Sequence, residues 1–110
     1  MVSQGSIIKI NLNPNEGHEQ AGYRPAIVVS NNFFNSHCNM TLVCPITNTN
    51  NSYPLHIPLD NRTQTTGVIL CEHIRSLDIQ ARGYRFVEQA PNDIIQTVIN
   101  TILAEMEQVE

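Results

Sequence analysis

Short apolar runs separated by polar turns fill most of this chain. The runs are rich in β-branched residues and are bounded by Gly, Pro, Asn and Asp, which is the pattern of β-strands. We predict strands at residues 6–11, 25–30, 40–46, 55–59, 68–77 and 83–89. The run at 25–30 is apolar throughout, so we expect a strand covered on both faces, whereas a proline inside 55–59 favours a sheet edge.

The C-terminal segment has a different period. Between residues 91 and 108, apolar side chains recur at the spacing of one helix face; they lie at positions 94, 95, 98, 99, 102, 103 and 106. Pro91 suits a first helical turn, and Asp93 lies near the positive end of the helix dipole. A helical turn is also expected at 33–38. Short strands followed by one terminal helix predict a mainly β fold, a compact antiparallel barrel or sheet with a helix packed on it.

Length and composition fit one domain covering residues 1–110. No apolar run approaches ~18 residues, so we expect no membrane-spanning helix and no membrane partner. The first residues lack the basic and apolar regions of a secretion signal, which favours the cytoplasm. An odd number of cysteines without metal or redox spacing agrees with this. Cys44 and Cys71 lie in apolar runs, where a thiol usually acts as a small hydrophobic group.

The formal net charge of −4 argues against broad electrostatic capture of nucleic acid. The excess acid lies in residues 91–110, which contain four acidic residues and no basic one. A local site made from a few arginines is still compatible with this charge, because Arg75, Arg82 and Arg85 fall within eleven residues. The four histidines show no ligand spacing and no acidic cluster accompanies them, so we predict neither a metal nor another cofactor.

The loop at 18–25, "HEQAGYRP", crowds five recognising groups into one turn, those of His18, Glu19, Gln20, Tyr23 and Arg24. Because Arg24 precedes a proline, its backbone is held extended at the start of a strand. A guanidinium fixed in this way matches two phosphate oxygens and would be a good phosphate clamp. The alternative is a solvated turn with a surface ion pair that contributes little.

Two further polar stretches adjoin predicted strands. Thr47 and Asn48 follow the strand at 40–46, where a hydroxyl and an amide could contact phosphate or base edges; the alternative is a plain Asn/Thr turn. Glu72 and His73 interrupt the strand at 68–77, so one of them should face inward or into a groove. A buried carboxylate needs a partner such as an arginine, and that pair could be structural or functional.

Four segments, "GHEQAGYRPAIVVS", "MTLVCPIT", "TTGVILCEHIRSLD" and "ARG", occur in the order typical of the MazF/PemK toxins, including the Kid branch. The resemblance covers nearly the whole chain. It implies a small SH3-like antiparallel barrel with a C-terminal helix, acting as a homodimer. It also implies an endoribonuclease that cuts single-stranded RNA within a short motif, paired with an antitoxin whose acidic flexible segment blocks the RNA groove.

The same resemblance assigns roles to individual residues. It places the catalytic arginine at Arg24 and its partner threonine at Thr47. RNA contacts are implied for Glu19, Gln20, Tyr23, Asn48, Glu72 and His73. The Kid branch also gives a catalytic role to the histidine at His18. That branch has an arginine where this chain has Leu70, so we favour the version based on Arg24 and Thr47. Many relatives have glutamine at the position of His73.

Metal-free RNA cleavage fits these side chains. The substrate supplies its own nucleophile, the 2′-hydroxyl, and the protein must stabilise charge and move protons. Arg24 can stabilise the charge and Thr47 can donate to a phosphate oxygen, while the proton transfer could fall to His18 or Glu19. The products would be a 2′,3′-cyclic phosphate and a 5′-hydroxyl.

Two other functions are compatible with a barrel of this kind. One is a CcdB-like toxin that binds DNA gyrase without cleaving RNA, and the other is a binding-only SH3-like module. The chain lacks tryptophan and has the Arg24 and Thr47 pair, which a gyrase binder would not require. Both observations favour the ribonuclease.

Overall fold

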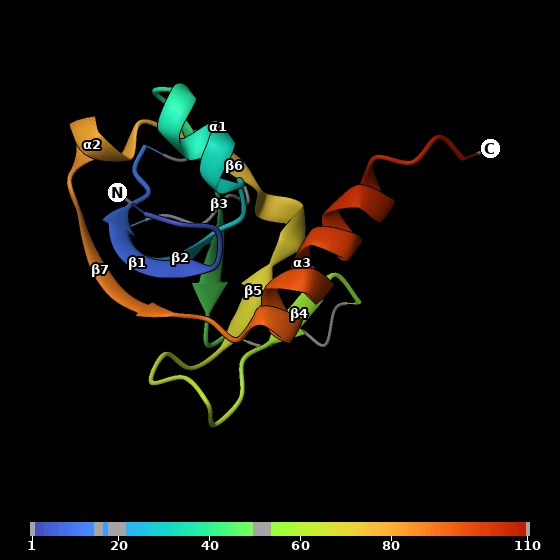
Figure 1. The fold of residues 1–110 in the computed structure, drawn as a ribbon. Coiled ribbons are helices and arrows are strands. Elements are labelled where there is room, and N and C mark those ends of the chain that lie inside the picture. Colours follow the sequence, from blue (N-terminus) through green and yellow to red (C-terminus); the bar gives the residue numbers. More distant parts are fainter. Residues whose placement is uncertain (1, 15–16, 18–21, 50–53, 110) are drawn as a thin grey trace.

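The computed structural model describes residues 2–14, 17, 22–49 and 54–109. Its strands and helices follow the chain in the order β1 Ser6–Asn11, β2 Tyr23–Val28, α1 Asn32–His37, β3 Thr41–Thr47, β4 His56–Pro58, β5 Val68–Leu70, the 3₁₀ turn η1 Cys71–His73, β6 Arg75–Leu77, α2 Ile79–Arg82, β7 Tyr84–Gln89 and α3 Asn92–Glu105. Figure 1 shows the strands curving around one another, with α3 beside β4 and β5.

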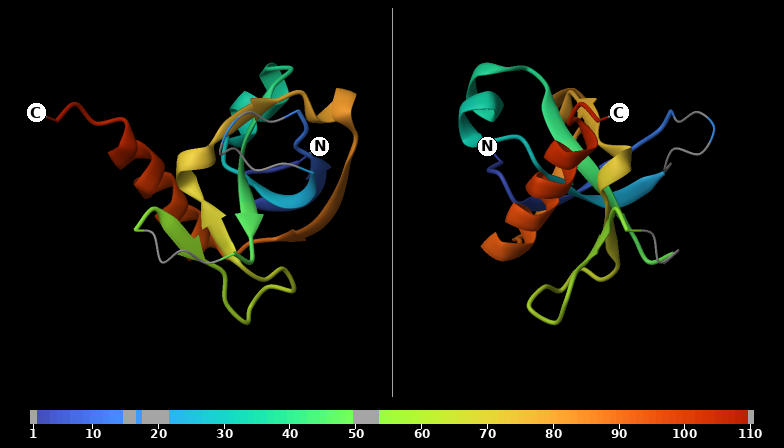
Figure 2. Two further views of the ribbon diagram at one scale, coloured as in Figure 1. Left: turned by 180° about the vertical axis from the view of Figure 1, so that it is seen from behind. Right: turned by 90° about the vertical axis from the view of Figure 1, so that its right-hand side faces the viewer.

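The strands form one antiparallel sheet in the order β4-β5-β3-β2-β1-β7, and β6 also pairs with β3. Among the described residues no ladder joins β4 to β7, so the sheet is barrel-like but open. This confirms the mainly β fold with a C-terminal helix. Figure 2 shows the connection between β4 and β5 extending away from the body of the molecule, as does the segment after α3.

Most predicted elements are confirmed. The pattern "SIIKIN" gives β1 with the bounds expected, and residues 26–28 of β2 are buried as predicted for a strand covered on both faces. The proline-containing strand β4 lies at the sheet edge. The C-terminal helix ends at Glu105, and Leu103 and Met106 are 58% and 65% exposed, so the buried face is narrower than predicted.

The prediction of one long strand at 68–77 is wrong. The segment follows β3 along its length, but its pairing shifts between Ile46 opposite Ile69 and Val43 opposite Arg75. Three residues on β3 therefore correspond to six on the other side, and η1 takes up the extra three. The short helix α2 was not predicted either.

Two apolar clusters lie on opposite faces of the sheet. The first lies under α3 and includes Ile27 and Cys44; the second includes Ala26, Val28 and Val43. The split follows the alternation of side chains along β2 and β3. The thiols of Cys44 and Cys71 are free and buried, as expected of small hydrophobic groups. No helix in the described part of the chain is both long enough and apolar enough to cross a bilayer.

Candidate active site

Arg24 and Thr47 lie on neighbouring antiparallel strands. The ladder between β2 and β3 pairs Val28 with Val43 and ends where Ala26 meets Pro45. Two further steps along both strands in the same register bring Arg24 level with Thr47. The guanidinium and the hydroxyl, 23 positions apart in the sequence, thus come from adjacent strand ends.

The same two residues share one face of the sheet. In β2, Ala26 and Val28 belong to the second apolar cluster, and alternation places Arg24 on their side. In β3, Val43 belongs to that cluster too, which places Thr47 on the same side. Arg24 is partly exposed and is held by an interaction of its own within the protein.

The surroundings of Thr47 restrict what it can do. The residue is 5% exposed, so only a small part of it can reach a substrate. Its Oγ1 accepts a hydrogen bond of 3.2 Å from the backbone N–H of Thr49, which leaves the hydroxyl proton to be donated. Gly67, at φ +116°, packs so closely that a Cβ there would clash with the Thr47 carbonyl oxygen.

Arginines hold the base of the loop that precedes β2. Arg82 Nη1 donates to the carbonyl oxygens of Asn11 at 2.8 Å and Asn13 at 2.6 Å, and Arg75 Nη1 donates to the carbonyl oxygen of Leu12 at 2.7 Å. The Asn13 side-chain oxygen accepts from the N–H of Gly22 at 3.0 Å, two residues before Arg24. Arg75 and Arg82 therefore hold the loop that precedes β2 through its backbone carbonyls.

The rest of the loop is only partly described. His18, Glu19 and Gln20 lie outside the described residues. Tyr23 is 61% exposed and presents its ring at the start of β2. Asn48 follows Thr47, and its side-chain oxygen accepts a hydrogen bond of 2.9 Å from the Thr66 hydroxyl.

Glu72 and His73 form a separate group in η1. Glu72 Oε2 lies 2.8 Å from His56 Nε2 and 3.8 Å from His73 Nε2. Glu72 has the partner that the sequence analysis required, but it is His56, brought there by the β4–β5 hairpin, rather than an arginine. Since Thr47 pairs with Val68, four residues before Glu72, the structure does not bring this group together with Arg24 and Thr47.

Burial raises the pKa values of two groups near Glu72, the carboxyl of Glu105 and the thiol of Cys71. Burial, and then repulsion by Glu72, raise the pKa of Glu105 at the end of α3 above its ordinary value. Burial also raises the pKa of Cys71 to about 12, with smaller contributions from Glu105 and Glu72. A thiol with so high a pKa stays protonated and is a poor nucleophile. The sequence does not indicate this role of His56, because no local pattern links residues 56 and 72.

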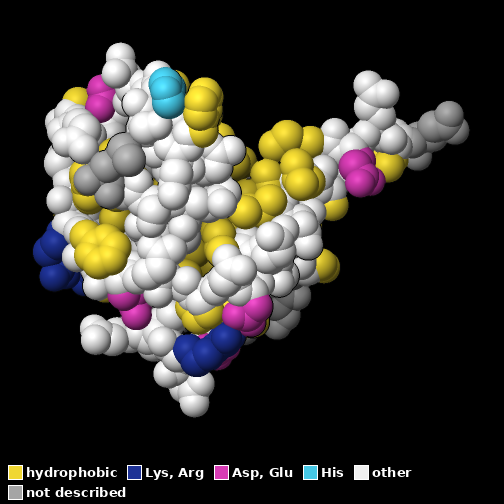
Figure 3. Space-filling model, in the orientation of Figure 1, with side chains coloured by type: hydrophobic (Ala, Val, Ile, Leu, Met, Phe, Trp, Pro, Cys, Tyr) yellow, Lys and Arg dark blue, Asp and Glu magenta, His cyan; other side chains and the backbone are white. Residues whose placement is uncertain are grey.

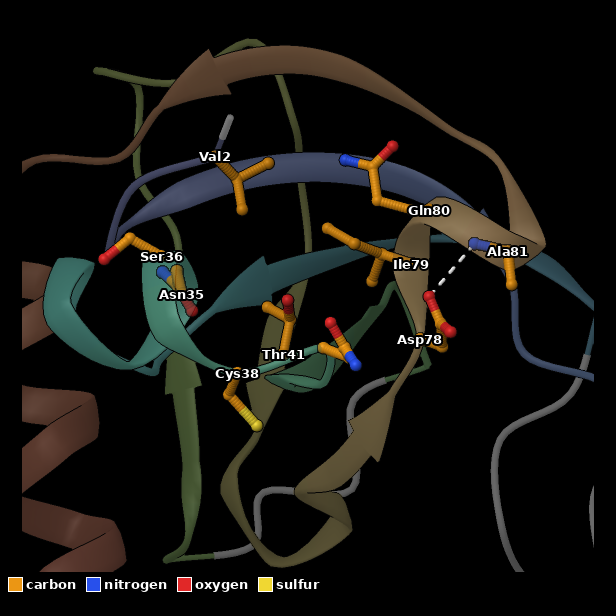
Figure 4. Close-up of a pocket in the computed structure, with 10 residues that line it drawn as sticks. Val2, Asn35, Ser36, Cys38, Thr41, Asp78, Ile79, Gln80 and Ala81 are labelled. Carbon is orange, nitrogen blue, oxygen red and sulfur yellow. Dashed lines mark hydrogen bonds between the residues drawn. The ribbon is translucent and has the colours of Figure 1, made fainter.

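A cavity of about 640 Å³ lies elsewhere, between α1 and α2 (Figure 4). Its acidic residue, Asp78, accepts a hydrogen bond of 3.1 Å from the N–H of Ala81 and so caps α2. The other side chains that line it are neutral, and Cys38 is its exposed thiol. None of the described residues that line this cavity is positively charged, so it is not suited to bind phosphate. We therefore place the candidate site at Arg24 and Thr47. Over the described ranges, no group of three His, Cys, Asp or Glu could hold a metal ion.

Comparisons with known proteins agree on one family. The profile of a family described as "PemK-like, MazF-like toxin of type II toxin-antitoxin system" matches residues 3–106. Endoribonuclease PemK of Escherichia coli is 32% identical over 105 residues, covering 92% of this chain and 79% of the relative. Endoribonuclease toxin ChpB of Escherichia coli strain K12 is 33% identical over 112 residues, covering 94% of this chain and 93% of the relative.

Solved structures give the same result for the fold. MazF from Deinococcus radiodurans superimposes with a TM-score of 0.89 at 31% identity, covering 96% of both chains. A MazE–MazF structure from the same organism matches with a TM-score of 0.81 at 32% identity, covering 96% of this chain and 97% of that one.

Proposed function

Because the chain belongs to the PemK-like, MazF-like toxins of type II toxin–antitoxin systems, we propose that it is an endoribonuclease that cuts single-stranded RNA, such as mRNA, at a specific sequence and without a metal ion. The observation that supports this proposal most is the β2–β3 register, with Ala26 opposite Pro45, which, continued by two residues, sets Arg24 level with Thr47 on one face of the sheet. A charge donor and a hydroxyl donor at neighbouring strand ends suit one phosphodiester.

The reaction needs little beyond these groups. The 2′-hydroxyl oxygen attacks the adjacent phosphorus, the bond from phosphorus to the 5′-oxygen breaks, and the products are a 2′,3′-cyclic phosphate and a 5′-hydroxyl. Arg24 stabilises the negative charge that builds up on the phosphoryl oxygens, and the Thr47 hydroxyl donates to one of them. The proton leaves the 2′-hydroxyl to His18 or Glu19, and the 5′-oxygen gains one.

Regulation follows the family. The MazE–MazF structures support an antitoxin partner, and we propose that its acidic flexible segment blocks the RNA groove and relieves growth inhibition. The chain, a single domain over residues 1–110, would act as a homodimer in the cytoplasm. A CcdB-like gyrase poison is not favoured, because the curated relatives named above are endoribonucleases.

The test is cleavage of a long single-stranded transcript by the purified protein, with cut sites mapped by primer extension. Arg24→Ala should lower the cleavage rate by roughly 10²–10³-fold, because a charge donor to the transition state is lost. Arg62→Ala is the matched control, since Arg62 pairs with Asp60 and Asp93 instead. A folded Arg24→Ala variant with near-normal cleavage would exclude the assignment.

Two further measurements test the chemical mechanism independently of the role assigned to Arg24. Cleavage should persist in chelator, and inhibition that one added metal reverses would contradict the metal-free reaction. An oligonucleotide with 2′-deoxyribose at the mapped cut site should resist cleavage, and its cleavage would refute attack by the 2′-hydroxyl.

A further inference from the structure

The last residues of the β4–β5 connection lie against the end of β3. The Thr66 hydroxyl donates to the side-chain oxygen of Asn48 at 2.9 Å. Gly67 packs against the backbone of Thr47, and Val68 of β5 is the cross-strand partner of Thr47. Three consecutive residues therefore meet the strand end that carries the candidate catalytic hydroxyl, and the position of that strand end depends on where the connection is held.

One carboxylate of β7 holds the two residues that come just before this contact. Glu88 Oε1 accepts a hydrogen bond of 3.0 Å from the backbone N–H of Gln64. Glu88 Oε2 accepts two bonds of 2.8 Å, from the backbone N–H and from the hydroxyl of Thr65. Hydrogen bonds to an ionised carboxylate are stronger than those between neutral groups. Partial burial alone would raise the pKa of Glu88, but these bonds lower it below its ordinary value, so the carboxylate is ionised at neutral pH.

The direction of the Glu88 side chain depends on a bulge in β7. Arg85 lies opposite Lys9 of β1. Three residues later, Glu88 lies opposite Ile7 rather than Ser6, so β7 has one extra residue over this stretch. Without it, the alternation of side chains would turn Glu88 to the other face of the sheet. The bulge therefore directs the carboxylate to the β4–β5 connection.

A second anchor holds the same connection farther from the candidate site. Arg62 forms ion pairs with Asp60 at 2.8 Å and with Asp93, at the beginning of α3, at 2.9 Å. Figure 3 shows a basic side chain among acidic ones at the foot of the molecule, where the connection lies in Figure 1. All three side chains are exposed, and exposed ion pairs contribute little. Glu88, in contrast, holds the main chain itself, two residues before Gly67.

We propose that Glu88 is a positioning residue for RNA cleavage, which places the Thr47 hydroxyl by holding the β4–β5 connection against the end of β3. This role rests on the proposed function, since the part played by Thr47 belongs to that reaction. Glu88 does not touch the RNA, so its loss leaves substrate binding in place and slows the chemical step.

The test compares Glu88→Ala, Thr47→Val and the double variant with the parent protein on one single-stranded transcript at neutral pH. Glu88→Ala should lower kcat roughly 10-fold with little change in KM, because a small displacement of a catalytic group is costly. Thr47→Val removes the hydroxyl that Glu88 places, so adding Glu88→Ala to it should lower kcat no further. Losses that multiply would mean that Glu88 acts independently of Thr47, and would overturn the proposal.

Two further variants separate positioning from stability. Asn31→Ala removes the side chain that accepts from the N–H of Phe34 at 2.8 Å and caps α1, so it should lower stability and leave kcat unchanged. Thr66→Val removes the exposed donor to Asn48 and should lower kcat while the fold persists, and Thr66→Ser should restore the rate. A parent-like kcat for Thr66→Val would overturn the proposal even if Glu88→Ala does not fold.

The outcomes separate the two proposals. If the parent cleaves RNA and Glu88→Ala loses no more kcat than Asn31→Ala, the positioning role is wrong and the proposed function stands. If the parent cleaves no RNA, both are wrong. Arg62→Ala, at the outer anchor, should cleave like the parent, and a loss as large as that of Glu88→Ala would show that Glu88 has no special role.

Discussion

Among single residues, Thr47 is the most constrained member of the candidate site. Thr47→Val keeps the shape of the side chain and removes the hydroxyl, so cleavage should fall about 10²-fold while the fold persists. Thr47→Ser keeps the hydroxyl and should retain most of the activity. Thr41→Val is the control, because Thr41 is equally buried at the other end of β3. Equal losses in the Thr41 and Thr47 variants would mean that the hydroxyl acts on stability alone.

A substitution at Gly67, which packs against the backbone of Thr47, tests how precisely the end of β3 must be placed. Gly67→Ala places a Cβ against the Thr47 carbonyl, so β3 or β5 must shift and both stability and kcat should fall. Gly83→Ala is matched to it, since Gly83 also has a positive φ of +77° but has nothing within 4 Å. That control should lose only the backbone cost of roughly 1–3 kcal/mol. Cleavage rate and urea unfolding measure the two effects, and similar kcat values in both variants would contradict this role of Gly67.

Sequence reasoning identified single residues better than pairs of residues. Arg24 and Thr47 stood out because each has a local signal, a proline after the arginine and polar residues after a strand. The links from Glu72 to His56 and from Lys9 to Arg85 have no local signal, because each depends on strand register. Register is decided by how two distant strands bury their apolar faces together.

At the scale of elements, the sequence predicted strands bounded by turn residues well, but it did not predict a short turn within a strand-like segment. β1 follows from a mainly apolar run and β7 from a mixture of apolar and polar residues, each bounded by turn residues. The segment at 68–77 was predicted as one strand because apolar residues lie on both sides of Glu72, from Val68 to Cys71 before it and at Ile74 and Leu77 after it. Only the partner strand β3 shows that three residues are surplus, and that surplus becomes η1.

The link from α2 to the loop before β2 supports a prediction about Arg82. Arg82→Ala removes the donors to the carbonyls of Asn11 and Asn13, so the path through Gly22 to Arg24 loosens. We expect kcat to fall roughly 10- to 100-fold with a smaller change in KM, because the guanidinium of Arg24 is misplaced rather than lost. Steady-state cleavage measures the split.

The control for that variant is Arg82→Lys, which keeps the charge but not the fork of donors. If Arg82 acts by position, the lysine variant should resemble alanine more than the parent. Recovery of full activity by lysine would mean that charge near the RNA, not loop geometry, is what matters.

Across the whole molecule, carboxylates divide into those that favour the folded state when charged and those that oppose it. Partial burial alone would raise the pKa of Glu88, but hydrogen bonds from the N–H groups of Gln64 and Thr65 and the Thr65 hydroxyl outweigh it and lower the pKa below the ordinary 4.5. Glu105 is the opposite case, since burial and Glu72 raise its pKa above 4.5. Glu88 joins the β4–β5 connection to β7, whereas Glu105 ends α3.

These opposite shifts predict opposite effects of pH on stability. The contribution of Glu88 is present above pH 4.5 and is lost as the pH falls through its lowered pKa, so Glu88→Gln should destabilise at neutral pH and less so in acid. Glu105 favours folding below pH 4.5 and loses that contribution as the pH rises through its raised pKa, so Glu105→Gln should stabilise at neutral pH. Urea unfolding from about pH 3 to 8 at one protein concentration measures both, because assembly would shift the midpoints. Changes of the same sign in the two variants at neutral pH would contradict this division of the carboxylates.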